Sequence, residues 1–444
     1  MLKQREMKWM AGILGAGILF VFLTMVYKDQ LTLSHIGYQI TESIFEGRFR
    51  EFYNVASWSY GLPIYFIYAL WSIPVWLIGF IGGFEVNTEA IPVILWYKVM
   101  LAVFAIWSIY LVGKLAEQLY ADKKREIQLQ YAASFLFVFP VFAIAQCDII
   151  GLCFVLLALY YYMKEQNVHF FIAIAVAITM KYFAIFVFLP LLLFRFRKIG
   201  RFIAALVLGM FLLAVDTLVM RQSDAAASLM DNQEYYVNEH IRRLAEVKID
   251  IGAYKEIGLL GFFFLALCIV AYVLSNRDTE KNKQYSIWLA FSGYLCFFLF
   301  YGCNFYWYIL LAPFLVLLAY TKPGLTKICL LLETLYGGTV ALDCMNKQHW
   351  VFLGPETFSH LLIGKEILDN RLFAKIYFLL ETYLPLVLGV SYAAVIGILI
   401  LTAPGVKDTP VEDGIEKEIR IVTWLRIGVI FAWIILALLG TVNF

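Results

Sequence analysis

Long uninterrupted apolar runs constrain this chain more than any other feature of its sequence. The longest reach the roughly 20 residues that a helix needs to cross about 30 Å of hydrocarbon, and they lie at 9–27, 92–117, 201–220, 257–275, 378–402 and 422–442. Shorter runs, separated by single polar clusters, are expected to form helical hairpins; they lie at 131–145, 149–163, 168–180, 183–196, 286–301, 305–321 and 326–343. Of the 444 residues 62% are hydrophobic and 15% are charged, unlike a soluble domain. The sequence therefore predicts an all-α integral membrane protein with about 13 transmembrane helices.

Charge and cysteine usage argue against two classes of protein. The formal net charge is +2, and neither a basic block nor an aromatic-basic repeat occurs, so we expect no binding of nucleic acid. The 7 cysteines include no CxxC pair. Several of them lie inside apolar runs, namely Cys153, Cys268, Cys296 and Cys329. Neither a disulfide framework nor a zinc site is indicated.

The basic residues predict how the chain is oriented. Lys and Arg cluster in 3–8, 122–125, 195–201, 277–283, 322–327 and 407–426. The positive-inside rule places these clusters, and with them the N-terminus, in the cytoplasm. No small-residue processing site follows the first run, so we expect that run to be kept as a helix. The short loops favour the plasma membrane of a bacterium, with a multi-pass chain whose polar, acid-bearing loops face the extracytoplasmic side.

This orientation requires that the segment 62–80 does not cross the membrane, because the cluster at 122–125 would otherwise fall outside. Pro63 and Pro74, with the glycine pair that follows, predict two half-helices near 62–83 that lie in the outer leaflet. The first outer loop is then expected to extend over 28–91.

Three acids are candidate catalytic residues. Asp29 follows the first apolar run directly, where a carboxylate can act as a base at the point where an amphiphilic substrate meets water. The alternative for an isolated acid is a solvated loop carboxylate. Glu42, about 13 residues further on, is the reserve base. Asp148 lies in the short turn with Gln146 between two apolar runs, where it can cap the next helix, orient a substrate, or do both.

Cations near the outer boundary are candidates for binding a phosphate. Lys181 and Lys98 lie within apolar surroundings, which is costly unless the ammonium meets an anion or snorkels to the interface. Arg242 and Arg243 are adjacent on an outer loop, and a guanidinium suits bidentate phosphate contact, although acids of the same loop are the alternative partners.

An aromatic turn at 301–308 completes the candidate site. It contains Asn304 and Tyr308, and together with Tyr60 it offers rings beside polar groups, as a sugar-binding surface needs. An interfacial aromatic belt is the alternative and explains most of the turn.

The order of these pieces resembles the multi-spanning glycosyltransferases of the GT-C type, particularly the polyprenyl-phosphate-mannose-dependent mannosyltransferases and their uncharacterised bacterial relatives. That family has an acid directly after the first helix, a Gly and Tyr before an aromatic-Pro segment, a Gly-Gln-x-Asp turn, a helix ending in Lys, and an aromatic turn that often opens with His. The similar residues here are Asp29, Gly47, Tyr53, Tyr60-Gly61-Leu62-Pro63, Ala145-Gln146-Cys147-Asp148, Met180-Lys181 through Pro190, and Asn304-Phe305-Tyr306-Trp307-Tyr308 through Pro313.

The chain departs from the family's pattern in two respects that bear on chemistry. The first loop lacks an Asp-x-Asp pair, so a metal-dependent mode gains no support, although a divalent metal is not excluded; no cofactor is predicted. Asn304 stands where the family often has His and cannot perform proton chemistry. The resemblance covers 9–320, which implies a GT-C-like catalytic module over 1–320 and additional transmembrane helices over 321–444.

The resemblance implies a hexosyltransferase that moves a mannose-like sugar from a polyprenyl-phosphate donor to a glycan or lipid-linked acceptor on the extracytoplasmic face, with inversion. Asp29 would be the base, with Lys181, helped by Lys98 or Arg242, holding the departing lipid phosphate. Asp148 would orient the acceptor hydroxyls or serve as a helper acid. Two other functions stay open from the sequence: a flippase or transporter of lipid-linked glycans, and a glycan polymerase or ligase that would use Arg242, Arg243 and His349.

Overall fold

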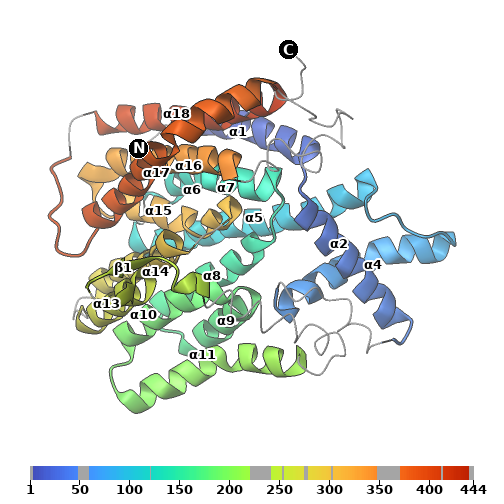
Figure 1. The fold of residues 1–444 in the computed structure, drawn as a ribbon, viewed down its shortest axis with the longest axis horizontal. Coiled ribbons are helices and arrows are strands. Elements are labelled where there is room, and N and C mark those ends of the chain that lie inside the picture. Colours follow the sequence, from blue (N-terminus) through green and yellow to red (C-terminus); the bar gives the residue numbers. More distant parts are fainter. Residues whose placement is uncertain are drawn as a thin grey trace. The chain divides into compact units, whose positions relative to one another are not determined.

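The structure is a computed structural model, and it is almost entirely helical (Figure 1). It describes residues 4–48, 60–120, 122–220, 242–252, 255–274, 279–301, 304–347, 371–411 and 414–439. The chain forms two compact units. The first unit comprises Met1–Gln30, Lys98–Ile149 and Asn304–Phe444, and the second comprises Leu31–Tyr97 and Ile150–Cys303. Neither unit begins or ends at 320, and the division of the chain at that residue stays a prediction.

The first unit joins the N-terminal helix to helices from the middle and the end of the chain. Its elements are α1 (Gln4–Thr24), most of α5 (Ile91–Leu119), α6 (Lys124–Ala132), α7 (Phe135–Val138), the π-helix η2 (Phe139–Ala143), the 3-10 helices η4 (Phe305–Leu310) and η5 (Pro323–Leu325), α15 (Ala312–Ala319), α16 (Thr326–Lys347), α17 (Arg371–Leu401) and α18 (Ile415–Leu439). Helix α1 packs against α18, and α16 packs against α17 (Figure 1).

The second unit combines two segments of the chain, Leu31–Tyr97 and Ile150–Cys303. Its elements are α2 (Lys28–Phe45) and α8 (Asp148–Met163), whose first residues belong to the first unit, then α4 (Leu62–Gly82), α9 (Asn167–Met180), η3 (Tyr182–Ala184), α10 (Ile185–Arg195), α11 (Ile199–Met220), α13 (Leu259–Val273) and α14 (Thr279–Phe300). An antiparallel hairpin of β1 (Lys248–Asp250) and β2 (Glu256–Gly258) is the departure from the all-α prediction.

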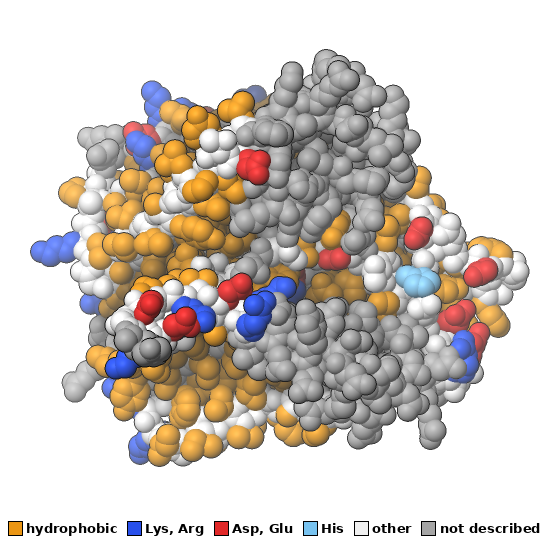
Figure 2. All heavy atoms as spheres, in the orientation of Figure 1, with side chains coloured by type: hydrophobic (Ala, Val, Ile, Leu, Met, Phe, Trp, Pro, Cys, Tyr) orange, Lys and Arg blue, Asp and Glu red, His pale blue; other side chains and the backbone are white. Residues whose placement is uncertain are grey.

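The structure supports the prediction that the chain is a membrane protein. Five helices of the described chain are long and apolar enough to cross a bilayer, or up to seven if each of two bent helix pairs counts as one span. The thirteen predicted crossings are therefore not confirmed. Large apolar side chains cover much of the described surface (Figure 2), and on α11 Leu208 is 56% and Phe211 is 64% exposed. Such exposure is expected where lipid, and not water, surrounds a helix.

The segment near 62–83 is one continuous helix, so the prediction of two half-helices was wrong. Pro63 lies in the first turn of α4, where its missing N–H would have had no intrahelical partner, and Pro74 is accommodated inside the helix. In its described residues, the loop expected over 28–91 contains helices α2 and α4. They are joined by a hydrogen bond of 2.7 Å from the Thr41 hydroxyl to the Ala69 carbonyl.

Small residues allow close helix packing in the second unit. A Cβ atom at Gly293 of α14 would lie 2.0 Å from the carbonyl oxygen of Phe186 in α10, so only glycine fits there. The rings of Phe186 and Phe183 pack on Phe297 with centroid distances of 5.0 and 4.3 Å. Close backbone approach and ring contacts replace the hydrophobic effect, which does not drive association between helices within lipid.

A buried ion pair stabilises the first unit. Arg426 of α18 contacts Glu333 of α16, and each residue is 1% exposed. The second terminal nitrogen of Arg426 donates to the carbonyl oxygen of Gln130 in α6 at 2.9 Å. Because three helices meet at one guanidinium, this contact ties the C-terminal helix to the segment that leads into η2 and the Gln146 turn.

Candidate active site

The carboxylate of Asp29 is the centre of the candidate site. Helix α1 ends at Thr24 and α2 begins at Lys28, so Asp29 lies in the first turn of α2. Its Oδ2 atom accepts a hydrogen bond of 3.2 Å from Nε2 of Gln146 and another of 3.2 Å from the hydroxyl of Tyr306. The partners are 117 and 277 residues away in sequence, and all three side chains belong to the first unit.

An irregular backbone presents Gln146 to Asp29. The π-helix η2 ends at Ala143, and the Gln146 N–H then donates to the Pro140 carbonyl at 2.9 Å. Ala145 between them has a φ of 58°, which lies in the left-handed region. Left-handed backbone favours glycine, and the resembled family has Gly at the corresponding position. π-helical turns of this kind are frequent at functional sites.

Asp148 begins α8 directly after this turn. It lies in the first helical turn, as expected for a capping acid, and is 3% exposed. Its negative charge acts on Tyr306, which places the acid within electrostatic range of the Asp29 cluster. The capping and substrate-orienting roles predicted for Asp148 stay predictions.

Tyr306 is a site residue that sequence reasoning missed. It lies in η4, outside the candidate spans, and its hydroxyl accepts a hydrogen bond of 2.6 Å from Nδ2 of Asn304. Burial, reinforced by the charges of Asp29 and Asp148, raises the pKa of Tyr306, so the hydroxyl stays protonated and donates a hydrogen bond to Asp29. The aromatic turn was the available signal, but a run of aromatic residues does not show which ring reaches an acid.

Tyr308, the ring predicted for this site, has a different neighbour. Its ring packs edge-to-face on Tyr336 of α16 at 5.8 Å, and it is 7% exposed. Its contribution to substrate binding stays a prediction. Asn304, by contrast, joins the Asp29 cluster through Tyr306.

Lys98 is buried against the end of α1. The ammonium donates to the carbonyl oxygens of Phe22 and Met25 and lies 5.0 Å from the ring centre of Phe22. A cation at these carbonyls is favourable because the last carbonyls of a helix have no intrahelical partner. The contact fixes the chain just before Asp29, which favours a positioning role; contact of Lys98 with substrate stays a prediction.

A second group of predicted residues gathers within the second unit. Lys181 follows the last residue of α9, and its ammonium lies over the rings of Tyr60 and Phe183 at 4.9 and 5.4 Å. The adjoining Gly61 is packed so closely on α9 that a Cβ atom would lie 2.0 Å from the Thr179 carbonyl oxygen. The sequence had separated Tyr60 from Lys181 by about 120 residues, and packing brings them together.

The structure does not test the roles predicted for the remaining candidates. Glu42 is half-buried on α2, and thirteen residues of helix correspond to about 20 Å from Asp29. Arg242 and Arg243 are exposed in the second unit. Tyr53 and His349 fall outside the described residues. Their predicted roles remain predictions.

Side chains of the kinds that bind metals do not cluster in the described part of the chain. No group of three or more His, Cys, Asp and Glu side chains there is arranged to hold a metal ion.

Comparison with known proteins yields one structural likeness. No protein-family model and no curated protein matches the sequence. The chain is similar to the crystal structure of ArnT from Cupriavidus metallidurans bound to undecaprenyl phosphate, with a TM-score of 0.44 and 13% sequence identity over 98% of this chain and 77% of that chain.

Proposed function

We propose that this protein is a membrane glycosyltransferase that transfers a mannose-like hexose from a polyprenyl-phosphate donor to an acceptor hydroxyl, with inversion, on the extracytoplasmic face. The observation that carries the proposal is the carboxylate of Asp29, held by Gln146 and Tyr306 where the first membrane helix ends. The order of the site residues, which resembles the GT-C pattern, supports the same assignment.

The two oxygen atoms of Asp29 have different surroundings. Oδ2 accepts both hydrogen bonds, whereas no described residue donates to Oδ1. A carboxylate that is oriented through one oxygen can take a proton on the other. In the proposed reaction the acceptor oxygen attacks the anomeric carbon, its proton passes to Asp29, and the bond from that carbon to the phosphate oxygen breaks, releasing polyprenyl phosphate.

Gln146 and Asp148 are suited to orienting the acceptor. The Oε1 atom of Gln146 is buried and receives no hydrogen bond from any described residue. A buried acceptor without a donor is costly, so a substrate hydroxyl that donates to it would be bound favourably. Asp148 offers a carboxylate within electrostatic range of the same cluster.

Lys181 is our proposed partner of the donor phosphate. Its ammonium is half-buried and lies over the rings of Tyr60 and Phe183, which restrict its movement. A restrained cation can stabilise the charge that develops on a departing phosphate. We expect Lys181→Gln to weaken donor use, whereas a snorkelling anchor would tolerate the same change.

The decisive test compares wild-type protein with Asp29→Asn in nanodiscs. Polyprenyl-phosphate mannose or glucose is supplied with candidate acceptors, and release of polyprenyl phosphate is followed. Loss of a general base typically costs a factor of about 10²–10⁴, and Glu89→Gln, which alters an exposed acid of the second unit, is the matched control.

Two outcomes would contradict the proposal. Full activity of Asp29→Asn would remove Asp29 from the role of base. Failure of the wild type to release polyprenyl phosphate with several donors and acceptors would favour a transporter of lipid-linked glycans instead.

A further inference from the structure

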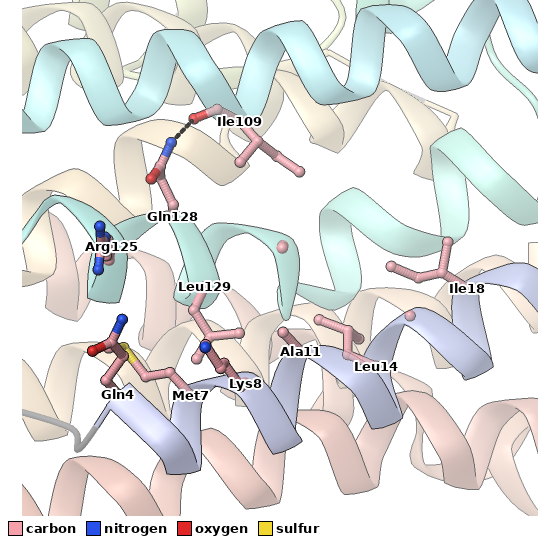
Figure 3. A pocket seen from close by; sticks show the side chains of 12 residues that line it. Gln4, Met7, Lys8, Ala11, Leu14, Ile18, Ile109, Arg125, Gln128 and Leu129 are labelled. Atoms are coloured by element: carbon pink, nitrogen blue, oxygen red, sulfur yellow. Dashed lines mark hydrogen bonds between the residues drawn. The ribbon is translucent and has the colours of Figure 1, made fainter.

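A groove in the first unit opens between α1, α5 and α6, and it contains none of the residues of the candidate active site. Its volume is about 600 Å³. The residues that line it are Gln4, Met7, Lys8, Ala11, Leu14, Gly15, Ile18, Ile109, Arg125, Gln128, Leu129 and Ala132. Figure 3 shows these side chains, with the Gln128 amide donating to the carbonyl of Ile109 at 3.0 Å. Helices α1 and α5, which contribute to its walls, are candidate membrane spans.

The polar groups of the groove gather at one end. Gln4 and Arg125 lie there, with Lys8 close by, while Ile18 lies at the opposite end among apolar side chains (Figure 3). The residues that line the groove include no acid. Both cations are exposed, and neither forms an ion pair with a described residue.

The acids nearest in sequence to these two cations are already engaged elsewhere. Glu6 accepts from Arg420 at 2.9 Å. Glu126 accepts from the hydroxyl of Tyr320 at 3.0 Å and lies 3.8 Å from Lys123. Neither of these acids pairs with Lys8 or Arg125, and the two cations favour an anionic occupant.

The length of the groove matches one leaflet of a membrane. Ten residues separate Lys8 from Ile18, which corresponds to about 15 Å along α1. This is about half of the roughly 30 Å hydrocarbon thickness. An acyl chain whose headgroup meets Lys8 and Arg125 would thus extend along the apolar part of the groove as far as the bilayer midplane.

We infer that this groove binds one anionic phospholipid of the leaflet in which α1 begins. The phosphate of a phosphatidylglycerol-type headgroup contacts Lys8 and Arg125, and one acyl chain lies along Ala11, Leu14 and Ile18. The site is independent of the proposed function, because it lies on other residues and needs no sugar donor.

The charge of the site is tested by native mass spectrometry of the full chain with equal amounts of phosphatidylglycerol and phosphatidylcholine. A cation near an anionic headgroup raises the affinity for that lipid about 5-fold. Two cations therefore give a preference of about 25-fold for phosphatidylglycerol over phosphatidylcholine. We expect Lys8→Gln with Arg125→Gln to abolish this preference. The control, Lys407→Gln with Lys417→Gln, removes two exposed charges outside the groove and should keep it.

The shape of the groove is tested with two glycines of α1. A Cβ atom at Gly15 or at Gly12 meets no atom within 4 Å, so a larger side chain can be introduced at both positions without an immediate backbone clash. Only Gly15 lines the groove. We expect Gly15→Phe to lower retention of phosphatidylglycerol several-fold and Gly12→Phe to leave it unchanged. Equal binding of both lipids to the wild type, an unchanged preference in the charge variant, or full retention in Gly15→Phe would overturn the inference.

Discussion

Replacing Glu333 by Gln should strongly destabilise the first unit. Glu333 of α16 and Arg426 of α18 contact each other, and each residue is 1% exposed. The substitution keeps the shape of the side chain and removes its charge. The guanidinium of Arg426 then remains buried with its two backbone carbonyl partners, Gln130 at 2.9 Å and Leu330 at 3.3 Å, but without a counter-ion.

The expected loss follows from the burial of the pair. Breaking a buried ion pair costs about 3–5 kcal/mol in the free energy of unfolding, because an uncompensated charge remains. The same two helices carry an exposed pair, Lys327 with Glu418 at 3.0 Å, whose side chains are 42% and 37% exposed. Glu418→Gln should cost about 0–1 kcal/mol, since exposed pairs contribute little.

Reversible unfolding by SDS in mixed micelles, followed by circular dichroism, measures both variants. A difference of about 3 kcal/mol would appear as roughly a 150-fold change in the unfolding equilibrium. Equal losses in Glu333→Gln and Glu418→Gln would refute the reasoning. Replacing both Glu333 and Arg426 by Leu should recover part of the loss, because no charge is then buried; a larger loss in this double variant would assign the effect to packing.

Other consequences of the structure are open to test. Ala145→Gly should lower the free energy of unfolding by about 1–2 kcal/mol less than Ala158→Gly does. Both methyl groups are 1% exposed, but of the two residues only Ala145 has a left-handed backbone, which glycine adopts without strain. Equal losses in the unfolding assay would contradict this. Gly61→Ala should lower the thermal stability and Gly12→Ala should not, since a Cβ at 61 meets backbone at 2.0 Å and one at 12 meets nothing within 4 Å; a stable Gly61→Ala protein would argue against this packing. Tyr306→Phe removes a hydrogen bond to a carboxylate and should slow sugar transfer about tenfold; an unchanged initial rate would exclude Tyr306 from the site.

Local patterns in the sequence singled out residues that the structure brings together. An acid at the end of the first helix and a Gln-x-Asp turn singled out Asp29 and Gln146, and the structure brings the two side chains to 3.2 Å. Sequence reasoning failed at α4, because proline was interpreted as a break although a proline in the first turn is compatible with a helix. Tyr306 was missed because its role depends on which ring of an aromatic run points to Asp29.

The sequence by itself determined that this is a helical membrane protein, because apolarity over about 20 residues is a local sum that any window of the chain reveals. The tertiary structure alone decided which polar residues meet. Gln146 and Tyr306 reach Asp29 across 117 and 277 residues, and Arg426 reaches Glu333 across 93. The physical reason is that such contacts depend on how remote helices pack and on where η2 and η4 interrupt regular structure, and no local pattern encodes either.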